Sequence, residues 1–219
     1  MYINEVCVIG PDGSCKSSAI NIAKRRLMYT TIVIQIYHLK PQIFSIANTK
    51  KPVVNPHGAE PRSPLISVLK LLVWSLEYWI KKVFHGFKNP TLILWDRYFH
   101  DLLFDPYRYR FGAPLIFARI FSKLVPKPGL MIFLDASPKL IQMRKKEVSP
   151  KETARQQKGY LKLAEKLKNS VVIDASSPIE LVVERLNNEI IGFLANKKKK
   201  QIGYIINKKS YKRNFSARI

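Results

Sequence analysis

The chain has 219 residues, of which 47% are hydrophobic and 11% aromatic, a composition that can bury a core and excludes a disordered body. Its length suits one large domain or two small ones, and we expect one. The formal charge of +23 favours polyanionic partners, among them nucleotides, nucleic acid, anionic lipid and acidic polysaccharide.

Short apolar runs alternate with helical patterns along the chain. In chain order we expect a strand at 3–9, a helix at 16–28, a strand at 31–37, a long loop at 41–63, a helix at 64–85, a strand at 91–95, a helix at 113–125, a strand at 130–135, a helix at 150–168, a strand at 170–173 and a helix at 178–195. Strands that are apolar throughout and separated by helices indicate an α/β fold, with a five-stranded parallel sheet flanked by helices on both faces.

Polar residues gather where the predicted strands end. They occupy 10–17, 38–41, 96–97 and Asp135. Ligands of parallel α/β sheets bind beyond the carboxyl ends of the strands, so we expect the functional site at this edge.

Residues 10–17, Gly-Pro-Asp-Gly-Ser-Cys-Lys-Ser, follow the first strand and open the first helix. They match the P-loop pattern GxxxxGK[ST], except that Cys15 stands where the second glycine belongs. In such a loop, backbone N–H groups surround phosphate oxygens, a lysine contacts the β- and γ-phosphates and a hydroxyl binds Mg²⁺. The predicted ATP-binding residues are Gly10, Gly13, Ser14, Cys15, Lys16, Ser17 and Ser18.

Cys15 leaves two interpretations open. If this position requires a positive φ, a β-carbon there costs roughly 1–2 kcal/mol. A loop displaced by about 1 Å could lose on the order of a hundredfold in rate. The chain is then either a working enzyme or a nucleotide-binding protein that has lost phosphoryl transfer and serves a regulatory or scaffolding role. A reactive thiol at Cys15 is the less favoured alternative to an inert substitution.

A second signature, Trp-Asp-Arg-Tyr-Phe-His-Asp at 95–101, ends the third predicted strand. A carboxylate at Asp96 can hold a metal ion or order an attacking group, and the guanidinium of Arg97 can bind an acceptor phosphate through two N–H groups. An ordinary surface pair is the alternative, which the presence of the P-loop pattern makes weaker.

Five segments resemble the thymidylate kinase-like P-loop proteins, in particular the bacterial subgroup associated with surface-polysaccharide gene clusters. The segments are GPDGSCKSS, YHLKP, VVNPHGAEPRS, LWDRYFHDLLFDPYRYRFGAP and LMIFLDASPKLIQMRKKEVSPKETARQQKGYLKLA, and the resemblance covers residues 3 to about 190. It implies a three-layer fold like that of nucleoside-monophosphate kinases, ATP as phosphoryl donor, Mg²⁺, a phosphorylated nucleotide-like or sugar-phosphate acceptor, and a possible homodimer.

The resemblance also implies roles for individual residues. The implied catalytic residues are Lys16, Asp96, Arg97 and Arg144, and the implied metal ligands are Ser17 and Asp96. The implied acceptor-binding residues are Asp12, Lys40, Arg97, Tyr98, His100, Asp101 and Arg108. Arg144 and Arg155 fall in a mobile lid at about 144–157. Lys40-Pro41 stands where the family has an Arg-Glu-Pro turn, which argues against thymidine monophosphate as the acceptor.

Other polar residues have open assignments. His57, Arg62, Tyr107 and Arg110 belong with the acceptor set or make structural hydrogen bonds, with equal weight. Asp135 is either a carboxylate of the Walker B kind or a structural strand end. We expect His38 and His85 to be structural.

Residues 196–219 carry seven Lys, two Arg and no acid. A run of like charges is usually solvated, so we expect a P-loop domain at 1–195 followed by a disordered basic tail that binds polyanions weakly and without specificity. Binding of a polyanion or membrane surface as the main function ranks last, because no nucleic-acid recognition motif is visible.

Two features bear on the compartment. Cys7 and Cys15 form no CxxC pair, so we expect neither structural zinc nor disulfides, and a reducing environment. No signal peptide is visible, and the apolar stretch at 65–84 is too polar to span a bilayer. The sequence therefore predicts a cytoplasmic protein without a transmembrane segment, in which helices 64–85 and 113–125 form core or a dimer interface.

Overall fold

A five-stranded sheet forms the centre of the protein in the computed structural model, which describes residues 4–28, 33–39, 57–58, 60–85 and 91–216. The strands are β1 (Asn4–Ile9), β2 (Val33–His38), β3 (Thr91–Asp96), β4 (Leu130–Asp135) and β5 (Ser170–Asp174). Their order across the sheet is β2-β3-β1-β4-β5, and every neighbouring pair is parallel. The predicted α/β class and five-stranded parallel sheet are confirmed.

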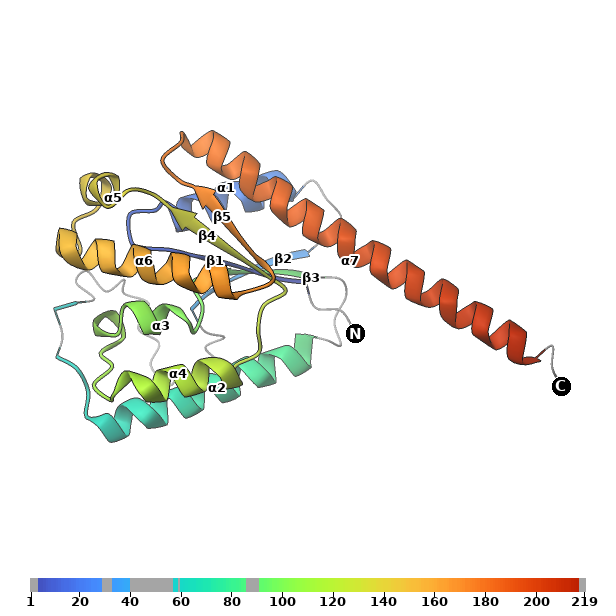
Figure 1. Cartoon of the computed structure of the whole chain (residues 1–219), viewed down its shortest axis with the longest axis horizontal. Coiled ribbons are helices and arrows are strands. Elements are labelled where there is room, and N and C mark those ends of the chain that lie inside the picture. Colours follow the sequence, from blue (N-terminus) through green and yellow to red (C-terminus); the bar gives the residue numbers. More distant parts are fainter. Residues whose placement is uncertain (1–3, 29–32, 40–56, 59, 86–90, 217–219) are drawn as a thin grey trace.

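Helices cover both faces of the sheet and make three layers (Figure 1). On one face lie α1 (Lys16–Leu27) and α7 (Ile179–Ser216), and on the other α2 (Pro64–His85), α3 (Asp101–Phe104), α4 (Leu115–Leu124) and α6 (Pro150–Lys166). The helix α5 (Pro138–Arg144) and the 3₁₀ turn η1 (Tyr107–Tyr109) complete the described elements. The short elements α3, α5 and η1 were not predicted, because one or two turns carry no readable periodicity.

Alternate residues of the central strands face the two layers. In β1, Cys7 and Ile9 enter the core under α2 and α4, whereas Val6 and Val8 enter the core under α1 and α7. Because both faces are buried, the strands are apolar at every position rather than at every second one.

Serine caps and prolines set where two of the later helices begin. Ser149 accepts a hydrogen bond from the Glu152 backbone N–H at 3.2 Å, and Pro150 opens α6 as the sequence indicates. Ser137 caps α5 in the same way at the Leu140 N–H, 3.3 Å away. These two short signals fix the segment that joins β4 to β5.

The basic C-terminal segment is helical, whereas its charge predicts disorder. Residues 196–216 continue α7, which leaves the body of the molecule beyond its packed part (Figure 1). Phe193 and Leu194 are its last residues packed on the core cluster. A helix nucleated by packing extends at one hydrogen bond per residue, and lysine is a good helix former. The prediction of a disordered tail from residue 196 is therefore corrected by a helix that reaches Ser216.

The outer side of α2 and α4 is apolar. Exposed hydrophobic side chains on it are Leu65, Ile66, Leu69, Leu72, Val73, Leu76, Trp79, Val83, Phe84, Ile116, Phe117, Ile120 and Leu124. The core is instead contacted by Leu71, Trp74 and Tyr78. Among the described helices, none is both long and apolar enough to cross a bilayer.

Candidate functional site

The loop between β1 and α1 depends on its two glycines. Gly10 has φ of +154° and Gly13 has φ of +91°. A β-carbon on Gly10 would lie 2.5 Å from the Leu134 carbonyl oxygen, and one on Gly13 would lie 2.9 Å from that of Ile141. The loop is thus wedged against the end of β4 and against α5, as only glycine allows.

Cys15 adopts the left-handed conformation, with φ of +61° and ψ of +20°. It is the N-cap residue of α1, and its side chain makes no capping hydrogen bond. The condition for strain stated from the sequence is met, so the β-carbon of Cys15 costs roughly 1–2 kcal/mol in this loop.

Lys16 begins α1 and folds back over its own loop. Its Nζ donates to the Pro11 carbonyl oxygen at 2.6 Å and lies 3.7 Å from Asp12 Oδ1. The side chain is 4% exposed. Burial lowers the pKa of Lys16 to about 8, although Asp101 and Asp96 oppose the shift. The ammonium group is therefore a buried cation with few hydrogen-bond partners, and an anion bound beside it would stabilise its charged form.

The remaining loop hydroxyls divide into inner and outer groups. Ser14 is fully buried, and its Oγ donates to the Pro11 carbonyl oxygen at 2.8 Å, so this side chain holds the loop together. Ser17 and Ser18 are exposed in the first turn of α1. Of the two, Ser17 has a partner across the sheet edge.

Ser17 Oγ donates to Asp96 Oδ2 at 2.6 Å, which joins the start of α1 to the end of β3. The other oxygen, Asp96 Oδ1, is buried and has no hydrogen-bond partner among the described residues. Burial raises the pKa of Asp96, but hydrogen bonds with His38 and Ser17 outweigh it, and the pKa lies below its usual value. Asp96 is therefore an ionised carboxylate with unused coordinating capacity.

This pair fits the Mg²⁺ that the sequence predicts. Mg²⁺ is usually held by one or two carboxylates, with water and substrate phosphates completing its shell. Ser17 and Asp96 offer a hydroxyl and a carboxylate with an unpartnered oxygen. No group of three or more His, Cys, Asp and Glu side chains suited to a metal gathers within the described ranges.

His38, expected from the sequence to be structural, belongs to the same group of side chains. Its Nδ1 lies 3.4 Å from Asp96 Oδ2. His38 is the last residue of β2 and is directly paired with Asp96 in the β2–β3 register. The strand pairing places them together, and the sequence alone does not reveal it.

Two arginines share one carboxylate of the loop. Arg97, with φ of +73°, donates through Nη2 to Asp12 Oδ1, and Arg108 donates through Nη1 to Asp12 Oδ2. Arg108 also donates to Glu147 Oε2 at 2.9 Å. Burial lowers the pKa of Arg97, but Asp101 outweighs it and the pKa lies above its usual value. Both predicted acceptor arginines are thus brought beside the loop, already paired with acids.

Asp101 contacts the guanidinium of Arg97 from the core side. It is fully buried and accepts hydrogen bonds from Arg97 Nη1 at 2.6 Å and from the Tyr109 and Tyr160 hydroxyls. Burial raises its pKa, but Arg97 and Lys16 outweigh this and hold the pKa below its usual value. Asp101, Tyr109 and Tyr160 therefore orient the guanidinium, and no sequence pattern pointed to the two tyrosines.

Tyr98 and His100, predicted at the acceptor, lie in the core. The Tyr98 hydroxyl donates to the Pro126 carbonyl oxygen at 2.5 Å, and the His100 ring stacks on Tyr98 with centroids 6.0 Å apart. Burial, with help from Lys127, lowers the pKa of His100 to about 4, so it is neutral. Their acceptor assignment is corrected, because the turn at Arg97 directs only that residue to the loop. Lys40 lies outside the described residues.

The lid segment contributes an acid to the site. Arg144 donates to the Ala175 carbonyl oxygen at 2.8 Å, and Arg155 donates to that of Phe104 at 2.6 Å and pairs with Glu152. Glu147 instead reaches the arginine network through Arg108. The structure therefore ties the predicted catalytic Arg144 to the end of β5, and not to loop 10–17.

A cavity of about 10 Å³ lies beside Asp12 and Glu147, with room for one water molecule. Its lining residues are Pro11, Asp12, His57, Asp105, Lys145, Glu147, Val148, Thr153 and Gln156. His57 lines this cavity, and its Nε2 lies 2.9 Å from Asp105 Oδ1.

The other residues with open assignments lie apart from this cavity. The Arg110 side chain makes a structural hydrogen bond, since its Nε donates to the Glu60 carbonyl oxygen. The Arg62 backbone N–H donates to the Arg110 carbonyl oxygen, and the Arg62 side chain is exposed. Tyr107 is 63% exposed. Asp135 accepts from Gln157 at 2.9 Å, as a structural strand end does.

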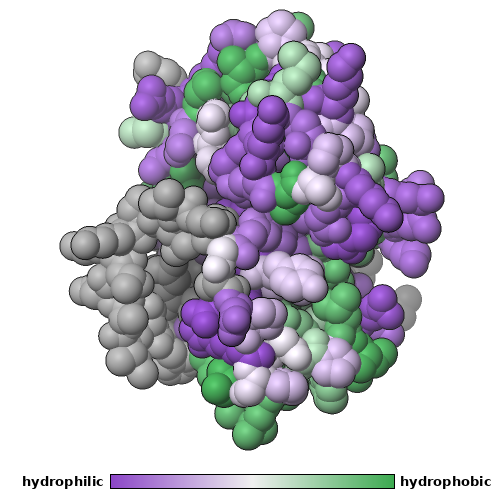
Figure 2. All heavy atoms as spheres, turned by 90° about the vertical axis from the view of Figure 1, so that its left-hand side faces the viewer, coloured by the Kyte–Doolittle hydropathy of each residue, from purple (hydrophilic) through white to green (hydrophobic). Residues whose placement is uncertain are grey.

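Figure 2 views the molecule from this edge of the sheet. Hydrophilic residues cover most of the upper part, and hydrophobic residues gather along the lower rim, where α2 and α4 lie. Compared with descriptions of protein families and with curated proteins, the chain matches none of them.

Proposed function

We propose that this protein binds the phosphate tail of ATP at residues 10–17 and moves the γ-phosphoryl group to a second, phosphate-bearing acceptor of nucleotide or sugar-phosphate type. One observation carries the proposal. A buried lysine, a serine–aspartate pair and a buried arginine, from α1 and the end of β3, converge at the carboxyl edge of a parallel sheet: Lys16, Ser17, Asp96 and Arg97. Phosphoryl transfer requires this combination of positioning and charge.

The donor side rests on the loop and the start of α1. Backbone N–H groups of the loop and the Lys16 ammonium group bind the phosphates. Ser17 and Asp96 hold Mg²⁺, which when bound neutralises phosphate charge as the reaction proceeds. Because Lys16 is buried beside carboxylates, its charge acts in a medium of low dielectric constant and stabilises negative charge strongly.

The acceptor side rests on two arginines. Arg97 is held in place by Asp101 and is fully charged, so it can bind an acceptor phosphate through its planar N–H groups. Arg108 adds a second guanidinium from η1. In the reaction, the acceptor phosphate takes the place of the Asp12 carboxylate between these two groups.

Calorimetry of ATP with Mg²⁺ tests the donor site. We expect micromolar binding by the natural protein and a loss of at least about a hundredfold in Lys16→Ala, because charged hydrogen bonds contribute about 1.5–3 kcal/mol each and several meet at this group. Lys162→Ala, which removes an exposed lysine of α6, is the matched control and keeps full affinity. Equal binding by all three proteins, or binding by none, contradicts the proposal.

A second candidate is a nucleotide-binding protein that has lost transfer, and the left-handed Cys15 favours it. Cys15→Gly separates the two, with ADP formation measured across phosphorylated acceptors. A rise of at least about tenfold in turnover points to an enzyme weakened by a displaced loop. Tight ATP binding with no turnover in either protein points to the regulatory role.

A further inference from the structure

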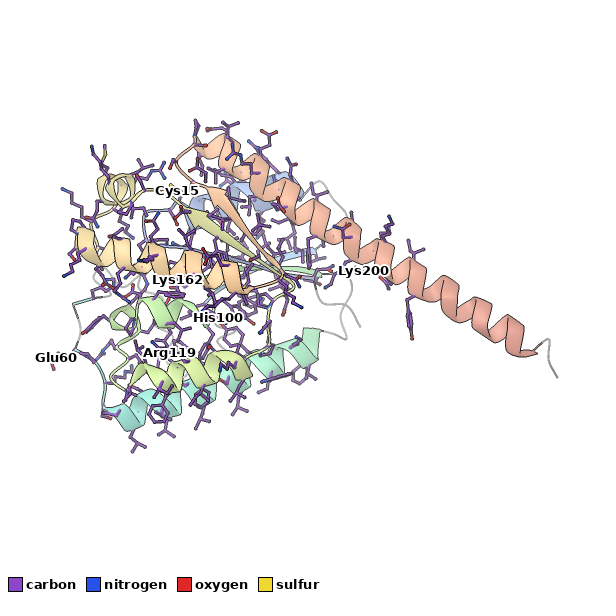
Figure 3. All side chains as sticks on the ribbon, in the orientation of Figure 1. Cys15, Glu60, His100, Arg119, Lys162 and Lys200 are labelled. Atoms are coloured by element: carbon purple, nitrogen blue, oxygen red, sulfur yellow. The ribbon has the colours of Figure 1, made fainter. Side chains whose placement is uncertain are left out.

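A second cavity, of about 370 Å³, lies at the opposite edge of the sheet. It is bounded by the starts of β4 and β5 and by one side of α7. Its lining residues are Gly129, Leu130, Lys168, Asn169, Ser170, Val171, Glu189, Gly192, Phe193, Asn196, Lys197 and Lys200. Figure 3 shows Cys15 of the phosphate loop and Lys200 of this cavity at the two ends of the sheet. Its volume is in the range of small-molecule sites.

The helix contributes to this cavity through a single face. Its six lining residues recur at intervals of three and four from Glu189 to Lys200, which puts them on one side of α7. The same helix carries further lysines, Lys198 and Lys199, that do not line the cavity. The cavity therefore has a specific set of lining side chains, which differs from the basic charge spread around the rest of the helix.

Charge and hydrogen-bonding groups around the cavity suit a particular ligand. Lys168, Lys197 and Lys200 supply three ammonium groups, and Lys197 also lies 5.1 Å from the centroid of the Phe193 ring. Glu189 supplies one carboxylate. Lysines favour a phosphate, whereas a carboxylate repels a bare anion but accepts hydrogen bonds from hydroxyl groups. A ligand that carries both a phosphate and hydroxyls satisfies both.

Two asparagines extend the set of hydroxyl partners. Asn169 and Asn196 line the cavity with amides that both donate and accept. Ser170 lines it too, but its Oγ already donates to the carbonyl oxygens of Ala164 and Leu167. The amides and the carboxylate are thus the groups offered to hydroxyls.

Gly192 keeps the cavity open. It lies in the interior of α7, where glycine costs up to about 1 kcal/mol relative to alanine. A β-carbon built on it meets no atom within 4 Å in the described part of the chain, so packing does not demand glycine here. By contrast, a β-carbon on Gly129, across the cavity, would lie 2.5 Å from the Phe193 ring. The absence of a side chain at position 192 preserves volume that a ligand can use.

From these observations we infer that this cavity binds a hexose phosphate, with the phosphate at Lys168, Lys197 and Lys200 and the hydroxyls at Glu189, Asn169 and Asn196. The site is separate from the proposed ATP site and does not depend on it.

Calorimetry with the full chain and glucose 6-phosphate tests the site. We expect glucose 6-phosphate to bind at least about tenfold more tightly than glucose or inorganic phosphate, because only it engages both groups of side chains. Lys16→Ala and Arg108→Ala both bind it unchanged, which separates this site from the phosphate loop and from the arginines of the proposed acceptor site. Loss of binding in Lys16→Ala, or equally tight binding of inorganic phosphate, overturns the assignment.

Matched variants locate the ligand. Gly192→Leu fills the cavity and abolishes binding, while Gly192→Ala retains it. Lys200→Glu weakens binding by about tenfold or more, while Lys199→Glu, on the same helix but outside the cavity, leaves it within about twofold. Glu189→Ala weakens glucose 6-phosphate but strengthens inorganic phosphate, a reversal that general charge attraction does not produce. No binding at millimolar concentration, or equal effects of the two lysine variants, refutes the site.

Discussion

At residue 15 the chain carries a β-carbon in a backbone conformation that suits glycine. We expect Cys15→Gly to raise the free energy of unfolding by about 1 kcal/mol, because relief of the left-handed strain exceeds the entropy that glycine adds to the unfolded chain. Urea unfolding of both proteins measures the difference. Ser18→Gly, in the first turn of α1, is the control and lowers stability. A Cys15→Gly protein no more stable than the natural one would show that the strain is absent.

Lys16 gives the protein a pH dependence of known sign. Its pKa is about 8 in the folded state and 10.5 as the ordinary value, so between these pH values the unfolded state binds more protons. Stability contributed by this group therefore rises from about pH 8 to pH 10.5, by on the order of 3 kcal/mol. Compared with the natural protein, Lys16→Met lacks this rise in urea unfolding at successive pH values. Lys162→Met keeps it, and identical slopes for Lys16→Met and the natural protein would contradict the burial of a strained cation.

Single residues of the site were predicted where a spacing rule exists. Gly10, Lys16 and Ser17 follow from the loop pattern, and Asp96 follows from its place at a strand end. The positions of the side chains after Asp96 were harder to predict. The left-handed backbone of Arg97 determines which of them points toward loop 10–17 and which enters the core. Tyr98 and His100 look like site residues in the sequence and are core residues in the fold.

At the scale of elements, α2 shows what periodicity leaves undetermined. The helix is apolar around most of its circumference, so either of two apolar stripes could pack against the core. The stripe with Leu71, Trp74 and Tyr78 faces the core. Its two aromatic rings pack against the rings of Trp95, Tyr98 and Phe99, at and just after the end of β3. The other apolar stripe, with Leu72 and Leu76, faces outward.

That outward stripe leads to a prediction about assembly. Exposed apolar patches of this kind mark interaction surfaces, and helix 64–85 is one of the two helices expected from the sequence to form core or a dimer interface. We expect the natural chain to sediment as a dimer and the double variant Leu72→Glu, Leu76→Glu to sediment at about half that mass, because four carboxylates would be buried at the interface. Lys162→Glu, at an exposed position of α6, keeps the dimer. A natural chain that sediments as a monomer at micromolar concentration would refute the prediction.

For the whole molecule, the alternation of apolar runs and helices was enough to predict a parallel sheet, since parallel strands need a crossover between them. The strand order β2-β3-β1-β4-β5 was not, because pairings such as His38 with Asp96 join segments far apart in the chain. The length of α7 could not be predicted from the sequence either, because two effects oppose each other. The run of like charges favours a solvated, disordered segment, whereas a helix that starts in a packed region tends to extend.

Asp12 lies between the two halves of the proposed site, since it sits 3.7 Å from the lysine of the donor loop and binds both acceptor arginines. An acceptor that takes Arg97 and Arg108 releases this carboxylate toward Lys16, whose affinity for ATP then changes. By thermodynamic linkage, ATP must change the affinity for the acceptor by the same factor. A single aspartate thus couples the binding of the two substrates of the proposed reaction, so that neither affinity is independent of the other.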